Sequence, residues 1–222
     1  MESKNSPGAG LPAPFENHKA KWESLATEKD MEAKYIYTDG DLSFRESGKR
    51  DYENLIKNDI HIKQFLKPYD NKVALEIGCG TGRMTEFIAQ DFKKVYALDI
   101  SRTMIETGAR RLAHLKNIEW IETDGMHLPK ALQVDLIFSY IVFQHCPKWM
   151  VESNLESAIK ILQNAGIMKI QVRGQVIRQD RWYSGDWYTK QEIEETLEGI
   201  GFEIVDTWHD PEEGRYLWVW SI

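Results

Sequence analysis

The sequence predicts an α/β fold in which helices pack on a mostly parallel sheet. Three observations carry this prediction. A short apolar strand, Val73 to Ile77, runs directly into three glycines and a helical pattern. Strand and helix patterns then alternate after Asp70, which implies right-handed crossovers between parallel strands. The chain ends in two strand patterns, Phe202 to Trp208 and Tyr216 to Ile222, which a turn separates, so an antiparallel hairpin is expected there.

The remaining elements of the sheet domain follow in order along the chain. Further strands are expected at Val95–Leu98, Ile118–Ile121, Val134–Tyr140 and Ile167–Val172. Helices are expected near Gly82–Gln90, Ser101–His114, Lys148–Gln163 and Lys190–Gly199.

Three segments are expected: an N-terminal arm, a helical segment and the sheet domain. Residues 1–14 are rich in proline and glycine and are expected to be a disordered arm. Residues 15–69 are mostly helical in pattern, either as a cap on a ligand pocket or as a layer that only covers the sheet edge. The sheet domain is expected to span residues 70–222. An apolar stripe ahead of the first strand is formed by Leu55, Ile56, Ile60, Ile62, Phe65 and Leu66.

Composition limits the classes of function. The 222 residues carry a formal net charge of −7 and are 42% hydrophobic, which suits one domain with a real core. No Lys/Arg cluster stands out, which argues against a general binder of nucleic acid or anionic membranes. We expect neither a membrane span nor a signal peptide. Cys79 and Cys146 fit no metal spacing, so a reduced, cytoplasmic protein without a metal is expected.

The glycine-rich run after the first strand indicates a nucleotide site. Gly78, Gly80 and Gly82 stand at alternate positions, with Glu76 before them. Glycine allows positive φ and lets a ligand lie against the backbone, and the following helix N-terminus offers amide donors. A dinucleotide fingerprint reads G-x-G-x-x-G, and here Arg83 takes its last position, so that pattern fails.

An acidic residue closes the second strand. Asp99 follows Gly80 by about 20 residues, the spacing expected for a carboxylate that binds ribose. A carboxylate accepts hydrogen bonds from both ribose hydroxyls. Asp99 and Ser101 also suit the N-cap of the next helix, and both roles can hold together.

The run Glu76-Ile77-Gly78-Cys79-Gly80-Thr81-Gly82, with Asp99 after it, resembles motif I of the class I S-adenosylmethionine-dependent methyltransferases. The resemblance covers about two-thirds of the chain, from Val73 to the C-terminus. It implies a Rossmann-like three-layer sandwich, whose seven-stranded, mostly parallel sheet ends in an antiparallel hairpin. It also implies S-adenosylmethionine as cofactor and S-adenosylhomocysteine as product.

The resemblance implies further cofactor contacts, each with an ordinary structural alternative. Ile100 and Met104 match adenine-packing positions but equally suit a helix core. Asp124 matches the acceptor for the adenine amine, although an Asp before glycine is also a turn former. The strand end at Ser139 and Tyr140 matches the position beside the methionine moiety. The expected cofactor contacts are Glu76, Gly78, Cys79, Gly80, Gly82, Arg83, Asp99, Ile100, Met104, Asp124, Gly125, Met126, Ser139 and Tyr140.

His145 is the candidate catalytic base. It lies just past the fourth strand, at the carboxyl edge where ligands of α/β proteins bind, and imidazole titrates near neutrality. A base helps methyl transfer only if the nucleophile is protonated. The alternative is that Gln144 and His145 are loop residues that cap the helix after Pro147 or line the cofactor end.

Substrate contacts are expected mainly between Arg173 and Tyr188, where the family places variable loops. Aromatic side chains offer flat apolar walls and arginine suits carboxylate or phosphate, so we hypothesise an acceptor with an apolar or planar body and an anionic group. A loop folded onto the protein by its own aromatics is equally open. The expected contacts are Gln144, Arg173, Arg178, Trp182, Tyr183 and Trp187.

These residues favour an enzyme that transfers the methyl group of S-adenosylmethionine to an O, N or C nucleophile of a small metabolite by in-line displacement. A protein or peptide amine methyltransferase and a non-catalytic S-adenosylmethionine-binding module stay open. Residues Ser139 to Val142 lack the Asn/Asp-Pro-Pro-aromatic signature of base-amine methyltransferases. We therefore expect a small-molecule methyl acceptor as partner, with no nucleic acid and no membrane. The oligomeric state stays open.

Overall fold

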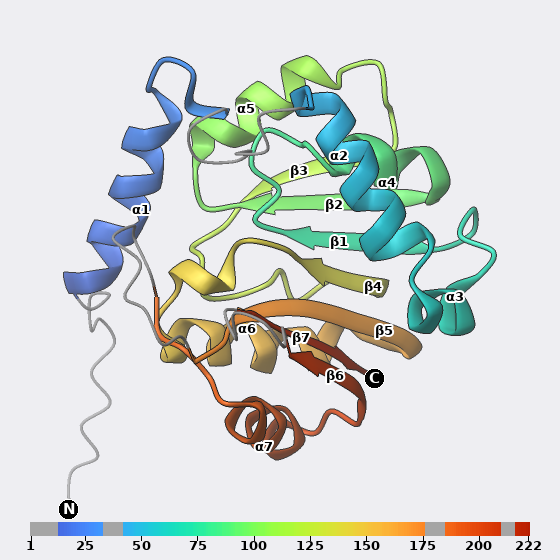
Figure 1. The fold of residues 1–222 in the computed structure, drawn as a ribbon. Helices are drawn as coiled ribbons and strands as arrows, with labels where there is room; N and C mark the ends of the chain where they lie inside the picture. Colours follow the sequence, from blue (N-terminus) through green and yellow to red (C-terminus); the bar gives the residue numbers. More distant parts are fainter. Residues whose placement is uncertain (1–12, 33–41, 176–184, 210–215) are drawn as a thin grey trace, which may run out of the picture.

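A seven-stranded sheet forms the centre of the computed structural model, which describes residues 13–32, 42–175, 185–209 and 216–222 (Figure 1). Its strands are β1 (Val73–Ile77), β2 (Lys94–Asp99), β3 (Ile118–Glu122), β4 (Val134–Ser139), β5 (Leu162–Arg173), β6 (Ile204–His209) and β7 (Tyr216–Ser221). They lie in the order β3-β2-β1-β4-β5-β7-β6. Strands β1 to β5 pair in parallel, while β7 pairs antiparallel with both β5 and β6. The predicted fold class, with its terminal hairpin, is confirmed.

Helices cover both faces of this sheet (Figure 1). The α-helices are α1 (Ala13–Ala26), α2 (Phe44–Tyr52), α3 (Ile60–Leu66), α4 (Thr85–Asp91), α5 (Arg102–Arg111), α6 (Lys148–Ile161) and α7 (Lys190–Ile200). A π-helix, η2 (Glu53–Lys57), follows α2, and a 3₁₀ turn, η3 (Phe143–His145), follows β4. Helix α1 lies beside the carboxyl ends of the parallel strands, where Lys19 pairs with Glu122 at the end of the edge strand β3 at 2.7 Å.

Each face of the sheet has its own core because side chains alternate along a strand. In β5, Met168 packs in the cluster that contains α6 and α7 side chains, whereas Ile167 packs in the cluster that contains α3 and α4 side chains. In β7, Val219 and Trp218 divide between the two clusters in the same way. The sheet is therefore buried on both faces, so a ligand can reach it only at an edge, such as the carboxyl ends of the strands.

Several element boundaries differ from the prediction. Helix α4 begins at Thr85 rather than Gly82, because Gly78, Gly80 and Gly82 all have positive φ and cannot continue a helix. Strand β5 begins at Leu162, which pairs with Val134, so α6 ends earlier than expected at Ile161.

The prediction of an apolar, buried stripe ahead of β1 is only partly correct. Ile56, Ile62 and Leu66 are fully buried, but Ile60 is 73% exposed. The reason is a break between η2 and α3, where Asp59 caps a new helix by accepting a hydrogen bond from the Ile62 amide at 2.8 Å. The new helix turns Ile60 outward. The expected arm falls almost wholly outside the described residues, and the three-segment division of the chain stays a prediction.

Candidate active site

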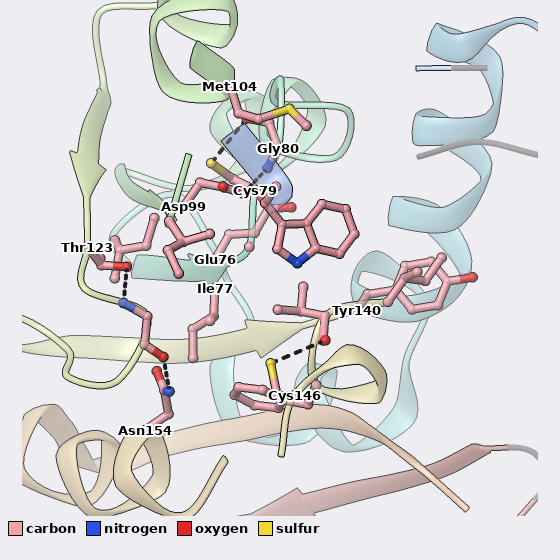
Figure 2. A pocket seen from close by; sticks show the side chains of 18 of the residues that line it. Glu76, Ile77, Cys79, Gly80, Asp99, Met104, Thr123, Tyr140, Cys146 and Asn154 are labelled. Atoms are coloured by element: carbon pink, nitrogen blue, oxygen red, sulfur yellow. Dashed lines mark hydrogen bonds between the residues drawn. The ribbon is translucent and has the colours of Figure 1, made fainter. Parts of the chain in front are cut away.

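A pocket lies at the carboxyl edge of the sheet, around the ends of β1, β2 and β4 (Figure 2). Strand β1 has β2 on one side and β4 on the other, so this is the point where the strand order reverses. Open parallel sheets bind their ligands at this point. The pocket holds about 1060 Å³ of space between protein atoms, including its open mouth.

The glycine loop forms one wall of the pocket. The amides of Gly78 and Cys79 both donate to the carbonyl oxygen of Leu98, at 2.7 and 2.9 Å, which fixes the loop against β2. Gly78 has φ +71°, and a Cβ added there would lie 2.2 Å from Cγ2 of Val142. Any side chain at Gly78 would therefore both strain the backbone and collide with the opposite wall.

Asp99 closes the end of β2 beside this loop (Figure 2). Its Oδ2 accepts from the Gly80 amide at 2.9 Å, and its Oδ1 accepts from the Ser101 amide at 2.8 Å. Burial raises the pKa of Asp99, although these amide hydrogen bonds act in the opposite direction. Since a carboxylate has about four acceptor positions, both oxygens keep room for a ligand. The N-cap of α5 is Ser101, whose side chain accepts from the Met104 amide.

Glu76 lies fully buried beneath the loop. The hydroxyl of Thr85 donates to Oε2 of Glu76 at 2.5 Å. Burial raises the pKa of Glu76 to about 7, while the Thr85 hydrogen bond and the charge of Arg83 oppose the rise. The carboxyl is therefore partly protonated near neutral pH.

This shift makes the free energy of unfolding depend on pH. The pKa of Glu76 rises from 4.5 to about 7 on folding, so the contribution of this group to stability is fully present below pH 4.5 and is lost as pH rises through about 7. The loss is about 3 kcal/mol over that interval. We expect Glu76→Gln, which keeps an acceptor for Thr85, to remove this part of the dependence in urea unfolding between pH 4.5 and 8. Glu106→Gln, at an exposed site on α5, is the control; equal pH slopes for wild type and Glu76→Gln would contradict the assignment.

The N-terminal helix α1 forms part of the pocket wall, while the role of residues 15–69 as a cap stays a prediction. His18 and Trp22 line the pocket from α1. Glu23 anchors the helix by accepting from the hydroxyl of Ser101 at 2.6 Å and from that of Thr103. These contacts tie α1 to the start of α5, directly after Asp99.

Ten of the fourteen expected cofactor contacts line the pocket: Glu76, Gly78, Cys79, Gly80, Arg83, Asp99, Ile100, Met104, Gly125 and Tyr140. Gly82, Asp124, Met126 and Ser139 do not. Asp124 instead holds its own turn, with Oδ1 accepting from the amides of Met126 and His127 and Oδ2 lying 2.8 Å from Nδ1 of His127. Partial burial acts to raise the pKa of Asp124. The hydrogen bonds from His127 and the backbone outweigh this effect, so the pKa of Asp124 is lowered. The structure shows the turn, and the contact with the adenine amine stays a prediction.

His145 and Gln144 are not among the residues that line the pocket. His145 is buried, and its ring meets that of Trp22 edge-on at 5.3 Å. Nε2 of Gln144 lies 3.0 Å from Nε2 of His145. Neither side chain caps α6, whose N-cap is Pro147 without a side-chain hydrogen bond. The imidazole that does line the pocket is that of His18, whose pKa burial lowers to about 4, aided by the charges of His145 and Lys21.

The expected substrate residues are only partly placed. Arg178, Trp182 and Tyr183 lie outside the described residues. Arg173 donates from Nη1 to the carbonyl oxygen of Gly185 at 3.0 Å, and Trp187 is 41% exposed. Neither lines the pocket.

Several lining residues carry no sequence motif. Asn154 of α6 donates from Nδ2 to the carbonyl oxygen of Gly125 at 2.8 Å and so fixes the loop after β3 (Figure 2). Ile141, directly after β4, has φ +60°, an unusual value for a β-branched residue, and its amide donates to Oε1 of Gln171 at 3.1 Å. Such strain gathers at functional sites. For the contact of α1 with the pocket, the signal in the sequence is Trp22 within a helical pattern.

The described residues hold no group of three or more His, Cys, Asp or Glu side chains placed to bind a metal ion. Within the same residues, no helix is both long and apolar enough to cross a membrane.

Comparisons with known proteins agree with this geometry. Residues 74–166 match the family model described as a methyltransferase domain. The probable cobalt-precorrin-6B C(15)-methyltransferase (decarboxylating) of Archaeoglobus fulgidus is 37% identical over 33% of this chain and 44% of its own length. The malonyl-acyl-carrier protein O-methyltransferase 1 of Ilyobacter polytropus is 32% identical over 44% of this chain and 39% of its own length. The matches thus span less than half of either relative.

Among solved structures, the DhpI–SAH complex shares the fold with a TM-score of 0.68 and 19% identity, covering 94% of this chain and 96% of that one. The sheet order, the glycine loop and the acidic end of β2 define the class, the class I S-adenosylmethionine-dependent methyltransferases. Residues 74–166 belong to the methyltransferase domain family. The family and the cofactor class expected from the sequence are confirmed.

Proposed function

We propose that this chain binds S-adenosylmethionine in the pocket and transfers its methyl group to a small-molecule acceptor by in-line displacement. The observation that carries the proposal is the pairing of the Gly78–Gly82 loop with Asp99 at the point where the strand order reverses. The residues fit the ligand: Gly78, Cys79 and Gly80 line the pocket with a loop that is held against β2, and Asp99 keeps acceptor positions for the ribose hydroxyls.

When bound, S-adenosylmethionine supplies an electrophilic methyl group on a sulfonium whose positive charge is lost as the bond breaks. The chain's part is to align the acceptor and to exclude water. Trp22 of α1 and Phe143 of η3 give the pocket apolar walls for this purpose. Tyr140 adds a third aromatic ring, stacked at 5.4 Å on Trp218.

The acceptor side is proposed to lie around η3. The Gly185 amide donates to the carbonyl oxygen of Gln144 at 2.8 Å, and the Asp186 amide donates to that of Cys146 at 3.1 Å. The segment that starts at Gly185 therefore docks on η3, next to the pocket. This supports the proposal that Gln144, Arg173, Arg178, Trp182, Tyr183 and Trp187 serve the acceptor.

The relatives leave the acceptor atom open. Their names describe methylation at carbon, at an oxygen of malonyl-acyl-carrier protein and at the nitrogen of phosphoethanolamine. The test is transfer of label from methyl-labelled S-adenosylmethionine to a panel of small carboxylic acids, phenols, quinols and amines. Transfer to one member supports the proposal. Binding without transfer to this panel or to a basic peptide favours a non-catalytic module, and transfer to the peptide alone favours a peptide amine methyltransferase.

We further propose His145 as the base for an acceptor that carries a proton. This role requires Trp22, which contacts the imidazole, to make room for the acceptor. His145→Asn is expected to lower kcat about 100-fold and to leave S-adenosylhomocysteine affinity within about twofold, because the imidazole lines no part of the pocket. The matched control is His127→Asn, at an exposed site. Unchanged kcat in His145→Asn would remove His145 from the mechanism.

A further inference from the structure

Helix α2 reaches the glycine loop although it lies outside residues 74–166, the part that matches the family model. The contact is made by Arg83, the residue after Gly82, which lines the pocket. Nη1 of Arg83 donates to Oδ2 of Asp51 at 2.6 Å and to the hydroxyl of Ser47 at 3.3 Å. All three side chains are buried. One nitrogen of the guanidinium is therefore held by α2.

The other edge of this guanidinium is available. Within the part of the chain that the structure describes, Nε and Nη2 of Arg83 have no hydrogen-bond partner, and both keep some accessible surface although the side chain as a whole is only 8% exposed. Together they form the planar fork that receives a carboxylate through two parallel hydrogen bonds. Cζ of Arg83 lies 5.9 Å from the ring centroid of Tyr140, another pocket residue at the end of β4.

The backbones of α2 and the loop are in direct contact. A Cβ added to Gly48 would lie 2.2 Å from the carbonyl oxygen of Arg83. Because that atom belongs to the backbone, it cannot move aside as a flexible side chain would. Asp51 is also shared, since its Oδ1 accepts from Nη2 of Arg50 at 3.0 Å. The carboxylate of Asp51 thus lies between two guanidinium groups. Because Arg50 also offsets its charge, Asp51 repels a second carboxylate at Arg83 less than it would if it had only one cationic partner.

The pocket gives the ligand a direction. Asp99 stands at the end of β2, whereas Arg83 and Tyr140 stand on the β4 side of the glycine loop. A ligand whose ribose meets Asp99 and which lies along the loop therefore brings its amino-acid part toward Arg83.

We propose that α2 is part of the cofactor site: Asp51 and Ser47 hold Nη1 of Arg83 so that the Nε–Nη2 edge receives the α-carboxylate of the ligand's amino-acid part. Asp51 is a positioning residue, which acts through Arg83. This inference rests on the proposed function, because it assumes that the pocket takes S-adenosylmethionine. It makes the affinity for one end of the ligand depend on a helix outside the matched domain.

The experiment compares two ligands by calorimetry. S-adenosylhomocysteine carries the carboxylate, and 5′-methylthioadenosine keeps the adenosine and the sulfur but lacks the amino-acid part. Arg83→Met is expected to weaken S-adenosylhomocysteine binding about 10- to 100-fold and Asp51→Asn about tenfold, the loss of a charge-assisted hydrogen bond. Both variants are expected to bind 5′-methylthioadenosine within about twofold of wild type, because adenosine contacts Asp99 and not α2. Lys49→Ala, at an exposed site on α2, is the control for both ligands.

The outcomes separate the inference from the proposed function. An equal loss for both ligands in Asp51→Asn, or an unchanged ratio of affinities in Arg83→Met, overturns the role of α2 while S-adenosylmethionine binding stands. Wild type that binds neither ligand overturns both proposals. If Asp51→Asn does not fold, Ser47→Ala replaces it. That variant is expected to bind S-adenosylhomocysteine about threefold more weakly and 5′-methylthioadenosine as wild type does. Equal S-adenosylhomocysteine affinities for wild type and Ser47→Ala would then overturn the inference.

Discussion

Asp99→Ala is expected to weaken S-adenosylhomocysteine binding at least about 100-fold, to below detection by calorimetry. Hydrogen bonds to a charged group contribute about 1.5–3 kcal/mol each, and Asp99 is proposed to accept two from the ribose. The substitution also releases the Gly80 amide, which Oδ2 of Asp99 holds at 2.9 Å, so the glycine loop loses an anchor. Both effects act in the same direction.

Asp124→Ala is the matched control for this prediction. The resemblance assigns the adenine amine to Asp124, but in the structure its carboxylate is occupied by its own turn. We therefore expect the affinity of the Asp124 variant for S-adenosylhomocysteine to fall about tenfold at most, because the loop after β3 loosens. Equal losses in the two variants would contradict this interpretation. Wild-type affinity in Asp99→Ala would contradict the cofactor site itself.

Lys169→Met is expected to reduce the free energy of unfolding by about 3–5 kcal/mol, because it leaves the buried carboxylate of Asp59 without its cation. Nζ of Lys169 lies 2.9 Å from Oδ2 of Asp59 and donates to the carbonyl oxygen of Leu55 at 2.8 Å. Trp220 also donates to Oδ2 of Asp59, at 3.0 Å, and Nζ lies 4.8 Å from its ring centroid. The side chains of Lys169, Trp220 and Asp59 therefore connect β5, β7 and the N-cap of α3.

Urea unfolding at neutral pH measures this effect. Lys190→Met is the control: its ammonium forms an exposed pair with Glu194 on α7, and such pairs contribute about 0–1 kcal/mol. The double variant Lys169→Met with Asp59→Asn should recover part of the loss, because no unpaired charge remains buried. A loss in Lys169→Met no larger than that in Lys190→Met would show that the Asp59 charge does not depend on Lys169.

The buried pair also illustrates what the sequence did not reveal about the fold. Lys169 stands in a strand pattern and Asp59 in a helical stretch, 110 positions apart, and neither residue belongs to a motif. The apolar stripe was likewise assigned to one helix, although the Asp59 cap divides it and exposes Ile60. A cap depends on a single side-chain hydrogen bond, which apolar periodicity does not record.

In the site, too, the sequence predicted some residues correctly and misplaced others. The sequence predicted the residues of the glycine loop and Asp99 because their spacing within a strand-turn-helix unit has few structural solutions. It assigned Asp124, His145 and Ser139 by their positions after strands, and the structure places all three off the pocket surface. A position after a strand sets which edge of the sheet a residue reaches, but the local hydrogen bonds decide where its side chain points.

By itself, the sequence determined the strands, the terminal hairpin, the glycine loop and the family, because apolar periodicity and glycine spacing are local properties of the chain. Only the tertiary structure decided that Trp22 of α1 lines the pocket, that Asp51 of α2 holds Arg83 and that Asp124 serves its own turn. These arrangements join residues far apart in the sequence or choose between competing partners of one side chain. Packing and hydrogen bonding make those choices only once the chain has folded.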